Sequence, residues 1–306
     1  MKRGFVIIFL LLGLSVNAQQ DPLFTQYMYN KLLLNPASAG NSDHLSIDLV
    51  DRIQWVGIEG APRTFSFSAQ TTLRNRKVGL GILGYRDALG PSINQGFMAT
   101  YAYRLLFESS SFSFGLQAGI KYFDLDWSVI RTKYPDDYYF LPQEIQRFTP
   151  DLNLGFYYQS PRFFAGLSTK QLLENEYGVI KSSDGKTTFS RLFRHFYMMT
   201  GGLIPLDEKI IFRPSLLAKY VKNAPVQVDL NASVLFNDIF WIGISFRSQK
   251  AIAFLSEFRI APQIRLGYSY DIYLNELQPY NTGSHEIRIG FDIKTEKNRM
   301  KTPRYF

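Results

Sequence analysis

The chain has 306 residues and a formal net charge of +8; 46% of its residues are hydrophobic, and it contains 19 tyrosines and 26 phenylalanines. Its lysines and arginines are scattered, with no dense basic run except in the tail at residues 294–304, so a nucleic-acid partner is not expected. The absence of cysteine excludes disulfides, thiolate metal sites and lipid-modified cysteine.

The first residues have the pattern of a secretory signal peptide. Lys2 and Arg3 precede an apolar run at residues 5–16, and Val16-Asn17-Ala18 is a small-residue cleavage site. The apolar run is well short of the roughly 20 residues that a membrane-spanning helix needs, and no later stretch reaches that length. We therefore predict a signal peptide at residues 1–18 and an exported mature chain that can enter a membrane only as strands.

Residues 19–42 do not alternate between apolar and polar side chains. Apolar residues occur at helical spacing (Phe24, Tyr27 and Met28), and Asn35-Pro36-Ala37 would end a helix. We predict that this segment forms a short helix or an extended stretch and acts as a plug.

From His44 onward the chain alternates apolar and polar residues, which is typical of strands with one apolar and one polar face. The pattern is clearest in residues 225–247, where the turn Asn237-Asp238-Ile239 separates two alternating runs. Many runs approach the roughly 9–11 residues with which a tilted strand crosses a bilayer. Fourteen segments follow the pattern, at about 44–53, 63–72, 78–86, 92–104, 111–122, 149–159, 163–172, 192–204, 209–221, 225–236, 240–247, 251–261, 264–274 and 285–294.

A soluble β-sandwich would also alternate, because its polar face meets water. Export, an even strand count and aromatic residues at strand ends, such as Phe236, Phe240 and Tyr270, favour a membrane barrel instead. A closed barrel also pairs every backbone polar group, as lipid requires. The predicted fold is all-β: an antiparallel transmembrane barrel of about fourteen strands at residues 43–294, with a periplasmic tail at 295–306.

The lengths of the connections support this topology. If both termini are periplasmic, the odd-numbered connections are extracellular and should be the longer ones. The long connections, at residues 123–148, 173–191 and 275–284, are the fifth, seventh and thirteenth. No even-numbered connection is long, which a sandwich would not explain.

Sequence motifs for chemistry are weak. Gly79-x-Gly81-x-x-Gly84 matches a dinucleotide fingerprint as a string but lies inside a strand, with no helix after it. We interpret it as small residues where the plug or another strand comes close. No nucleophile and base show informative spacing. The histidines lie in different segments without the spacing of metal ligands: His44, His195 and His285. We predict no cofactor, no metal and no enzymatic activity.

Two blocks of sequence resemble the PorP/SprF membrane proteins associated with type IX secretion. The first contains Gln20-Asp21-Pro22, Phe24, Gln26-Tyr27-Met28, Asn30, Asn35-Pro36-Ala37 and Ala39-Gly40. The second contains Arg52, Gln54-Trp55, Gly57, Gly60-Ala61-Pro62 and Thr64, and the later Asp87, Gly90-Pro91 and Gly283-Ser284-His285-Glu286-Ile287 are also similar to family features. The resemblance covers the whole mature chain. Lys31 and Ser38 depart from the family's pattern, which has a proline and an aromatic residue there.

The resemblance implies an outer-membrane barrel of the fatty-acid-transporter-like kind that assists secretion or cell-surface anchoring of cargo. Its partners would be a secreted protein with a type IX C-terminal domain, other secretion or gliding-motility components, and outer-membrane lipid.

Our hypothesis is that the outer loops and rim bind this cargo while the plug closes the lumen. Aromatic residues suit protein interfaces because they bury much area at low entropic cost. The candidate partner-binding residues are Trp55, Tyr134, Tyr138, Tyr139 and Phe140, and the candidate plug residues are Phe24, Gln26, Tyr27, Asn35 and Pro36. The aromatic loop at residues 123–148 could instead fold inward. The alternative function is a channel for hydrophobic or small polar solutes.

Overall fold

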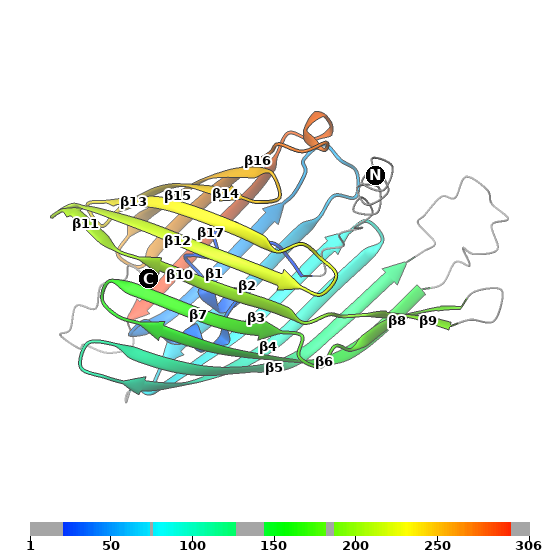
Figure 1. Ribbon diagram of the computed structural model, residues 1–306, viewed down its shortest axis with the longest axis horizontal. Coiled ribbons are helices and arrows are strands. Elements are labelled where there is room, and N and C mark those ends of the chain that lie inside the picture. The colour runs from blue at the N-terminus through cyan, green and yellow to red at the C-terminus, as the bar shows by residue number, and fades with distance from the viewer. Residues whose placement is uncertain (1–20, 74–75, 127–143, 182–186, 295–306) are drawn as a thin grey trace, which may run out of the picture.

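The computed structural model describes residues 21–73, 76–126, 144–181 and 187–294. Fifteen strands in this part of the chain form one antiparallel sheet, and the sheet closes because β10 pairs with β12. The result is a long barrel (Figure 1). Its strands, in chain order, are β1 His44–Ile53, β2 Arg63–Thr72, β3 Val78–Leu89, β4 Ser92–Leu106, β5 Ser111–Asp126, β6 Glu144–Gln159, β7 Phe163–Lys170, β10 His195–Gly202, β11 Ile204–Asp207, β12 Ile210–Val221, β13 Gln227–Phe236, β14 Phe240–Arg247, β15 Ala251–Ala261, β16 Ile264–Tyr273 and β17 Ser284–Lys294.

The ring contains fourteen strands, because β10 and β11 are successive pieces of one strand. Both pair with β12, and Leu203 separates them. Each of the fourteen predicted segments overlaps one strand of the ring, so the predicted fold class is confirmed. The first and last strands, β1 and β17, pair along their whole length.

Two features go beyond the predicted elements. Strands β5 and β6 stay paired out to Asp126 and Glu144, past the predicted ends at residues 122 and 149, so both ends of the predicted loop at 123–148 are strand. A separate two-stranded sheet, β8 (Glu176–Lys181) and β9 (Thr187–Arg191), forms inside the connection predicted at 173–191. Backbone pairing needs no apolar face, so it continues beyond the region where lipid imposes alternation.

The alternation places apolar side chains outside the barrel and polar ones inside, the reverse of a soluble core. Along β13, Leu230 is 50% exposed, whereas its neighbour Asn231 is 6% exposed. The buried polar and charged residues lie on the inner face of almost every strand, from Asp48 on β1 to Asp292 on β17. This arrangement is that of a barrel whose outer wall meets hydrocarbon.

The assignment of outward and inward side chains along β13 can be tested directly. We expect Leu230→Arg to destabilise the barrel by about 2–4 kcal/mol, because an arginine near mid-bilayer faces lipid. The matched control is Val226→Arg, at a residue that is 56% exposed and lies in the connection between β12 and β13. At that rim the cost falls to about 0–1 kcal/mol. Urea unfolding in lipid vesicles measures both, and equal losses would contradict the assigned depth.

The two ends of the barrel differ. We call one the loop end: it carries the connection at residues 54–62, the β8–β9 hairpin and the connection at 274–283, which contains the 3-10 helix η4 (Gln278–Tyr280). We call the other the turn end, where the connections at residues 107–110, 160–162 and 237–239 are short. In Figure 1 the β8–β9 hairpin marks the loop end at the right, and β11 marks the turn end at the left. This asymmetry agrees with the predicted alternation of long and short connections.

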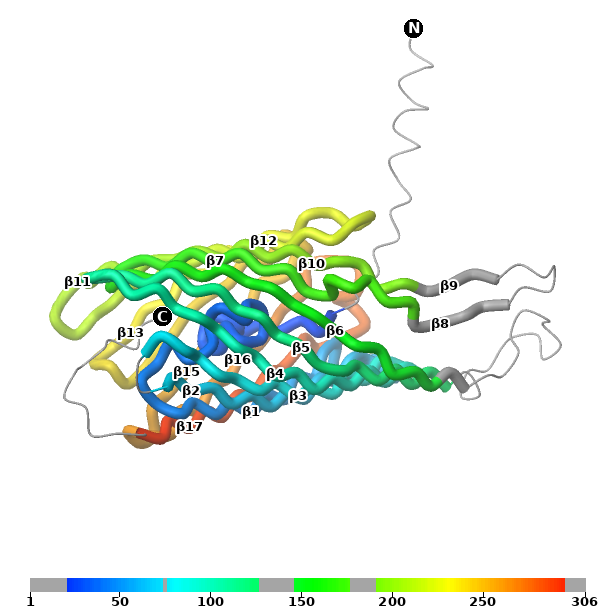
Figure 2. The backbone as a smooth tube through the Cα atoms, turned by 90° about the horizontal axis from the view of Figure 1, so that it is seen from below, coloured from blue at the N-terminus to red at the C-terminus, as the bar shows by residue number. Residues whose placement is uncertain are grey.

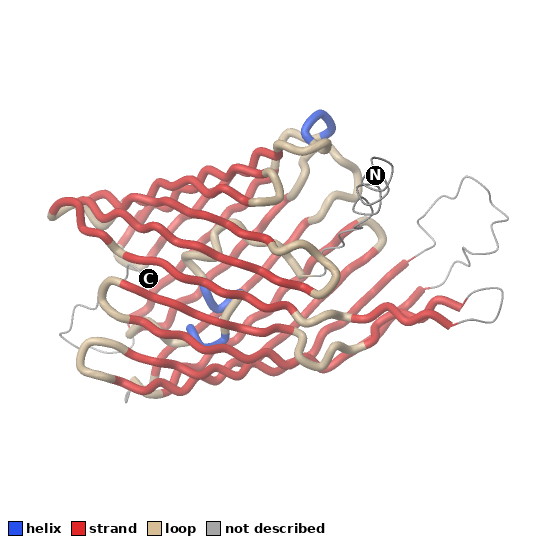
Figure 3. The backbone as a smooth tube through the Cα atoms, viewed as in Figure 1, coloured by secondary structure: helices blue, strands red, loops and turns tan. Residues whose placement is uncertain are grey.

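Residues 21–43, which we call the N-terminal segment, lie inside the barrel (Figure 2). The segment contains two 3-10 helices, η1 (Lys31–Leu33) and η2 (Pro36–Ser38), which Figure 3 shows within the ring of strands. Asn35 caps η2 by accepting a hydrogen bond from Ala37 N at 2.9 Å. In the described part of the chain, no helix is long and apolar enough to span a membrane.

Candidate functional site: the luminal interface

The contact between the N-terminal segment and the inner wall, which we call the luminal interface, runs the length of the barrel. Asp21 lies at the loop end, beside Lys170 at the end of β7. Ala39 and Gly40 lie at the turn end, where Arg104 donates to both carbonyls. The segment therefore crosses the barrel from the loop end to the turn end before β1 begins. The two described chain ends, Asp21 and Lys294, lie at opposite ends of the barrel, although the sequence had suggested that both termini share one side.

At the loop end, Asp21 anchors the segment to a cluster of cations. Its carboxylate lies 2.9 Å from Lys170 Nζ and 3.8 Å from Lys121 Nζ, and Tyr197 Oη donates to it at 3.4 Å. Gln171 also donates to it. Burial alone would raise the pKa of the Asp21 carboxyl, but the neighbouring positive charges, Lys170 first among them, hold it well below its usual range. The carboxylate is therefore ionised and tied to β5, β7 and β10.

Four residues further along, Thr25 joins three strands. Arg52 Nη1 donates to Thr25 Oγ1 at 2.7 Å, and Thr25 Oγ1 donates to Asp271 Oδ2 at 2.9 Å. Arg52 also bonds Asp271 at 2.6 Å and Glu286 at 3.3 Å, and all three of these charged side chains are fully buried. Glu286 accepts in turn from the backbone N–H groups of Thr25 at 2.7 Å and Gln26 at 2.8 Å. Every charge in this group has partners, as buried ions require.

A second ionic network lies beside the first on the inner wall. Arg288 pairs with Asp48 at 2.5 Å and with Glu257. Arg265 pairs with Asp292 at 2.8 Å. These groups join β1, β15, β16 and β17 and lie around the seam where the first and last strands meet, so the seam is cross-linked from inside.

Toward the turn end the fit depends on small residues in the wall. A Cβ added at Gly79 would lie 2.0 Å from Ala39 O, and one at Gly115 would lie 2.1 Å from Ala37 N. Asn35 Nδ2 donates to Phe156 O at 3.0 Å and to Leu167 O at 3.3 Å, which ties the segment to β6 and β7. Backbone therefore packs on backbone here, a contact that only glycine permits.

The Gly79-x-Gly81-x-x-Gly84 string is explained by the same contact. Gly79 and Gly81 face the N-terminal segment, and a Cβ at Gly81 would lie 3.0 Å from the side chain of Leu32. Gly84 does not belong to this contact, because a Cβ there would meet nothing closer than 3.8 Å. Interpreting the motif as a close approach holds for its first two glycines and not for the third.

Among the described residues, Lys31 is a buried cation of the luminal interface that makes no ion pair. It is 8% exposed, its ammonium lies 4.3 Å from the ring centroid of Phe164, and the charged group that acts on it is another cation, Arg213. Burial and Arg213 both lower the pKa of Lys31. Cation–π contact with Phe164 and Tyr157 offsets part of the desolvation cost.

We expect Lys31→Met to stabilise the barrel by about 1 kcal/mol or more, because it removes a buried charge without a carboxylate partner and keeps the apolar stem. The control is Lys209→Met on the exposed connection between β11 and β12, which should change stability by less than about 0.5 kcal/mol. Urea midpoints in lipid vesicles compare the two. A loss of stability in Lys31→Met would mean that the ammonium has a favourable partner.

The five candidate plug residues all lie in the luminal interface and are all buried: Phe24, Gln26, Tyr27, Asn35 and Pro36. Asn231 Nδ2 donates to Tyr27 Oη at 2.5 Å, and Gln26 Nε2 donates to Glu286 O at 3.1 Å. The sequence did not reveal that Thr25 would also anchor the segment, or that Asp271 and Glu286 would be its partners on the wall. The only signal was that Glu286 belongs to a block that resembles the family.

Of the candidate partner-binding residues, the structure describes Trp55 alone. Trp55 lies in the first connection at the loop end, half-buried, with its ring edge-on to Tyr273 at 6.1 Å. Its backbone adopts a φ of 47° and its N–H donates to Ser284 Oγ at 3.1 Å, so the side chain is held at the rim. The other four candidates lie outside the described residues: Tyr134, Tyr138, Tyr139 and Phe140. The predicted signal peptide and C-terminal tail also lie outside them.

Comparison with solved structures identifies the same kind of barrel. A TodX mutant described as a monoaromatic hydrocarbon channel matches at a TM-score of 0.52 and 10% identity, over 86% of this chain and 94% of that one. The toluene transporter TbuX of Ralstonia pickettii matches at a TM-score of 0.51 and 9% identity, over 86% and 92% of the two chains. Such low identities establish the fold alone. No curated protein sequence matches this chain.

A sequence profile of the family described as type IX secretion system membrane protein PorP/SprF matches residues 16–291. With the barrel fold, this match identifies the protein as an outer-membrane barrel related to type IX secretion. The chain belongs to the PorP/SprF family of type IX secretion system membrane proteins.

Proposed function

We propose that this barrel is a non-enzymatic scaffold that assists secretion of type IX cargo, or holds that cargo at the cell surface, by binding it through the loop end and rim. The observation that carries the proposal is the luminal interface. The N-terminal segment follows the whole lumen and is fixed at the loop end by Asp21, four residues later by Thr25 and at the turn end by Gly40. A segment held along the lumen in this way suits a protein that binds partners at its surface.

The loop end supports the proposal from a second direction. It carries the longer connections and the β8–β9 hairpin, and Trp55 is held there by its backbone and by Tyr273. A fixed aromatic side chain at a rim loses little entropy when a partner covers it. Trp55, with Tyr134, Tyr138, Tyr139 and Phe140, remains our proposed contact set for the C-terminal domain of the cargo. Secretion and gliding-motility components are the other proposed partners.

A solute channel is the competing function, because the structural neighbours named above are described as hydrocarbon channels and transporters. Transport through the lumen would require the N-terminal segment to leave. Its buried ion pairs at Asp21 and around Thr25 oppose that movement, since separating buried charges from their partners is costly. We therefore rank the scaffold first.

A tagged pull-down from outer membranes in mild detergent, read by mass spectrometry, tests the proposal. We expect one large secreted protein to co-purify and to disappear from the cell surface when the gene is deleted. Trp55→Ala should reduce its recovery while the barrel stays folded. Recovery of the barrel alone, with surface proteins unchanged on deletion and stable conductance in planar bilayers, would favour the channel.

A further inference from the structure

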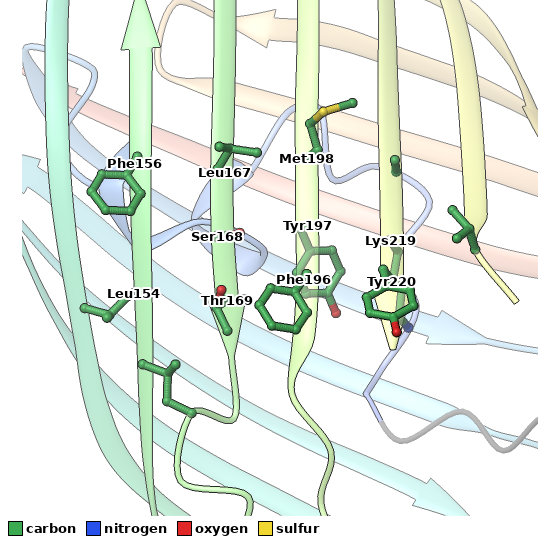
Figure 4. Close-up of a pocket in the computed structure, with 13 residues that line it drawn as sticks. Leu154, Phe156, Leu167, Ser168, Thr169, Phe196, Tyr197, Met198, Lys219 and Tyr220 are labelled. Atoms are coloured by element: carbon green, nitrogen blue, oxygen red, sulfur yellow. The ribbon is translucent and has the colours of Figure 1, made fainter. Parts of the chain in front are cut away.

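The outer wall of the barrel is hollowed across β6, β7, β10 and β12. The registers of these strands align their outward side chains in two rows. The row nearer the loop end is Leu154, Thr169, Phe196 and Tyr220, and the next row is Phe156, Leu167, Met198 and Ala218. The short side chains of Thr169 and Ala218 stand among long ones, and this leaves a depression of about 410 Å³, which we call the wall hollow (Figure 4).

The wall hollow is apolar and opens outward. In Figure 4, Leu154, Phe156, Phe196 and Met198 project from the outer face of the strands. Phe196 lies beside the depression, and its side chain is 44% exposed. In a membrane such a surface meets acyl chains, and a depression among long side chains can hold one chain in place.

Cations stand at the loop-end rim of the wall hollow. Arg194 and Lys222 lie two residues beyond Phe196 and Tyr220, in the connections just outside β10 and β12, and both are exposed. Arg194 Nε donates at 3.1 Å to the carbonyl of Leu172, which lines the hollow. Glu174 Oε2 lies 3.7 Å from Arg194 and 3.0 Å from Arg191. Arg194 and Lys222 are thus two cations next to the hollow, and Glu174 contacts Arg194.

We propose that the wall hollow is a binding site for one anionic membrane lipid, with an acyl chain in the depression and the headgroup phosphate against Arg194 and Lys222. The order of groups along the wall matches such a lipid. Apolar surface lies at the depth of the hydrocarbon, aromatic rings lie at its edge, and basic side chains follow where the headgroups begin. The site lies on the outer wall, so it is independent of the scaffold function proposed above.

Native mass spectrometry of the full-length mature barrel in detergent, with dioleoyl phosphatidylglycerol and dioleoyl phosphatidylcholine as probes, tests the site. We expect one tightly retained phosphatidylglycerol, with a dissociation constant about tenfold lower than that of phosphatidylcholine, because basic side chains favour an anionic headgroup. Ala218→Phe fills the hollow and should weaken retention of both lipids by about tenfold or more. Thr169→Phe fills the row of the hollow nearer the loop end and should also weaken retention of both lipids.

Matched variants separate the acyl and headgroup contacts. Ala118→Phe, at an exposed outward alanine on β5, should leave retention unchanged. Arg194→Gln with Lys222→Gln should abolish the preference for phosphatidylglycerol but keep phosphatidylcholine. Arg63→Gln with Lys250→Gln removes the same charge elsewhere at the loop end and should keep the preference. Unchanged retention in the two filling variants, equal affinity of the wild type for both lipids, or a polypeptide cross-linked at position 218 would overturn the proposal.

Discussion

Arg52→Ala is expected to lower the free energy of unfolding by about 3–5 kcal/mol, because it removes one partner of a buried ionic group and leaves a buried carboxylate uncompensated. Arg52 is 0% exposed and is the residue that joins Thr25, Asp271 and Glu286. Asp271 would retain Arg247 at 3.5 Å, whereas Glu286 would lose its cation. Urea unfolding in lipid vesicles and the heat-dependent mobility of the barrel on gels measure the loss.

The control for Arg52 is Arg63→Ala, which breaks an ion pair of similar length at the surface. Arg63 Nη2 lies 2.9 Å from Asp51, but the two side chains are 63% and 34% exposed. Surface pairs contribute about 0–1 kcal/mol, so this variant should unfold close to the wild type. Similar losses in both variants would show that the buried group does not hold the N-terminal segment.

The second large effect is expected from Gly79→Val combined with Gly115→Val. New Cβ atoms would overlap backbone atoms of Ala39 and Ala37, which cannot move aside as a flexible side chain could. The turn-end half of the N-terminal segment must then leave the wall. We expect the variant to conduct ions in planar bilayers well above the wild type, because the lumen is no longer filled there.

Gly84→Val is the matched control for this pair. It introduces the same side chain on β3, where an added Cβ meets nothing within 3.8 Å. Its conductance should equal that of the wild type. If the double variant folds and its conductance equals that of the wild type, the proposal that this segment occludes the lumen is contradicted.

Much of the barrel could be predicted from period-two alternation, because lipid outside and polar side chains inside impose it on every spanning strand. Leu230 and Asn231 lie on the predicted sides. The β8–β9 hairpin could not be predicted this way, since it pairs outside the region that imposes the pattern. Strand β11 was also missed: the predicted segment at 192–204 ends at its first residue, and the rest of β11 fell in the connection predicted before residue 209.

The luminal interface was harder to predict, because its partners are far apart in sequence. Thr25 and Asp271 are 246 positions apart, and Gln26 and Glu286 are 260 apart. No local pattern reports such a pairing. In the structure, however, the blocks that resemble the family meet: Gln26 comes from the first, Arg52 from the second, and both contact Glu286 from the last. The residues that resemble the family therefore include residues through which the N-terminal segment contacts the wall.

The position of the N-terminal segment has a consequence for biogenesis. The ring is sealed where β1 meets β17, from His44 opposite Lys294 to Ile53 opposite His285. Residues 21–43 precede β1 and lie within that ring, so the strand that closes the ring also contacts them. Thr25 and Gln26 bond Glu286 on β17 itself. Closure of the ring and docking of residues 21–43 are thus coupled, because both depend on where β17 places Glu286.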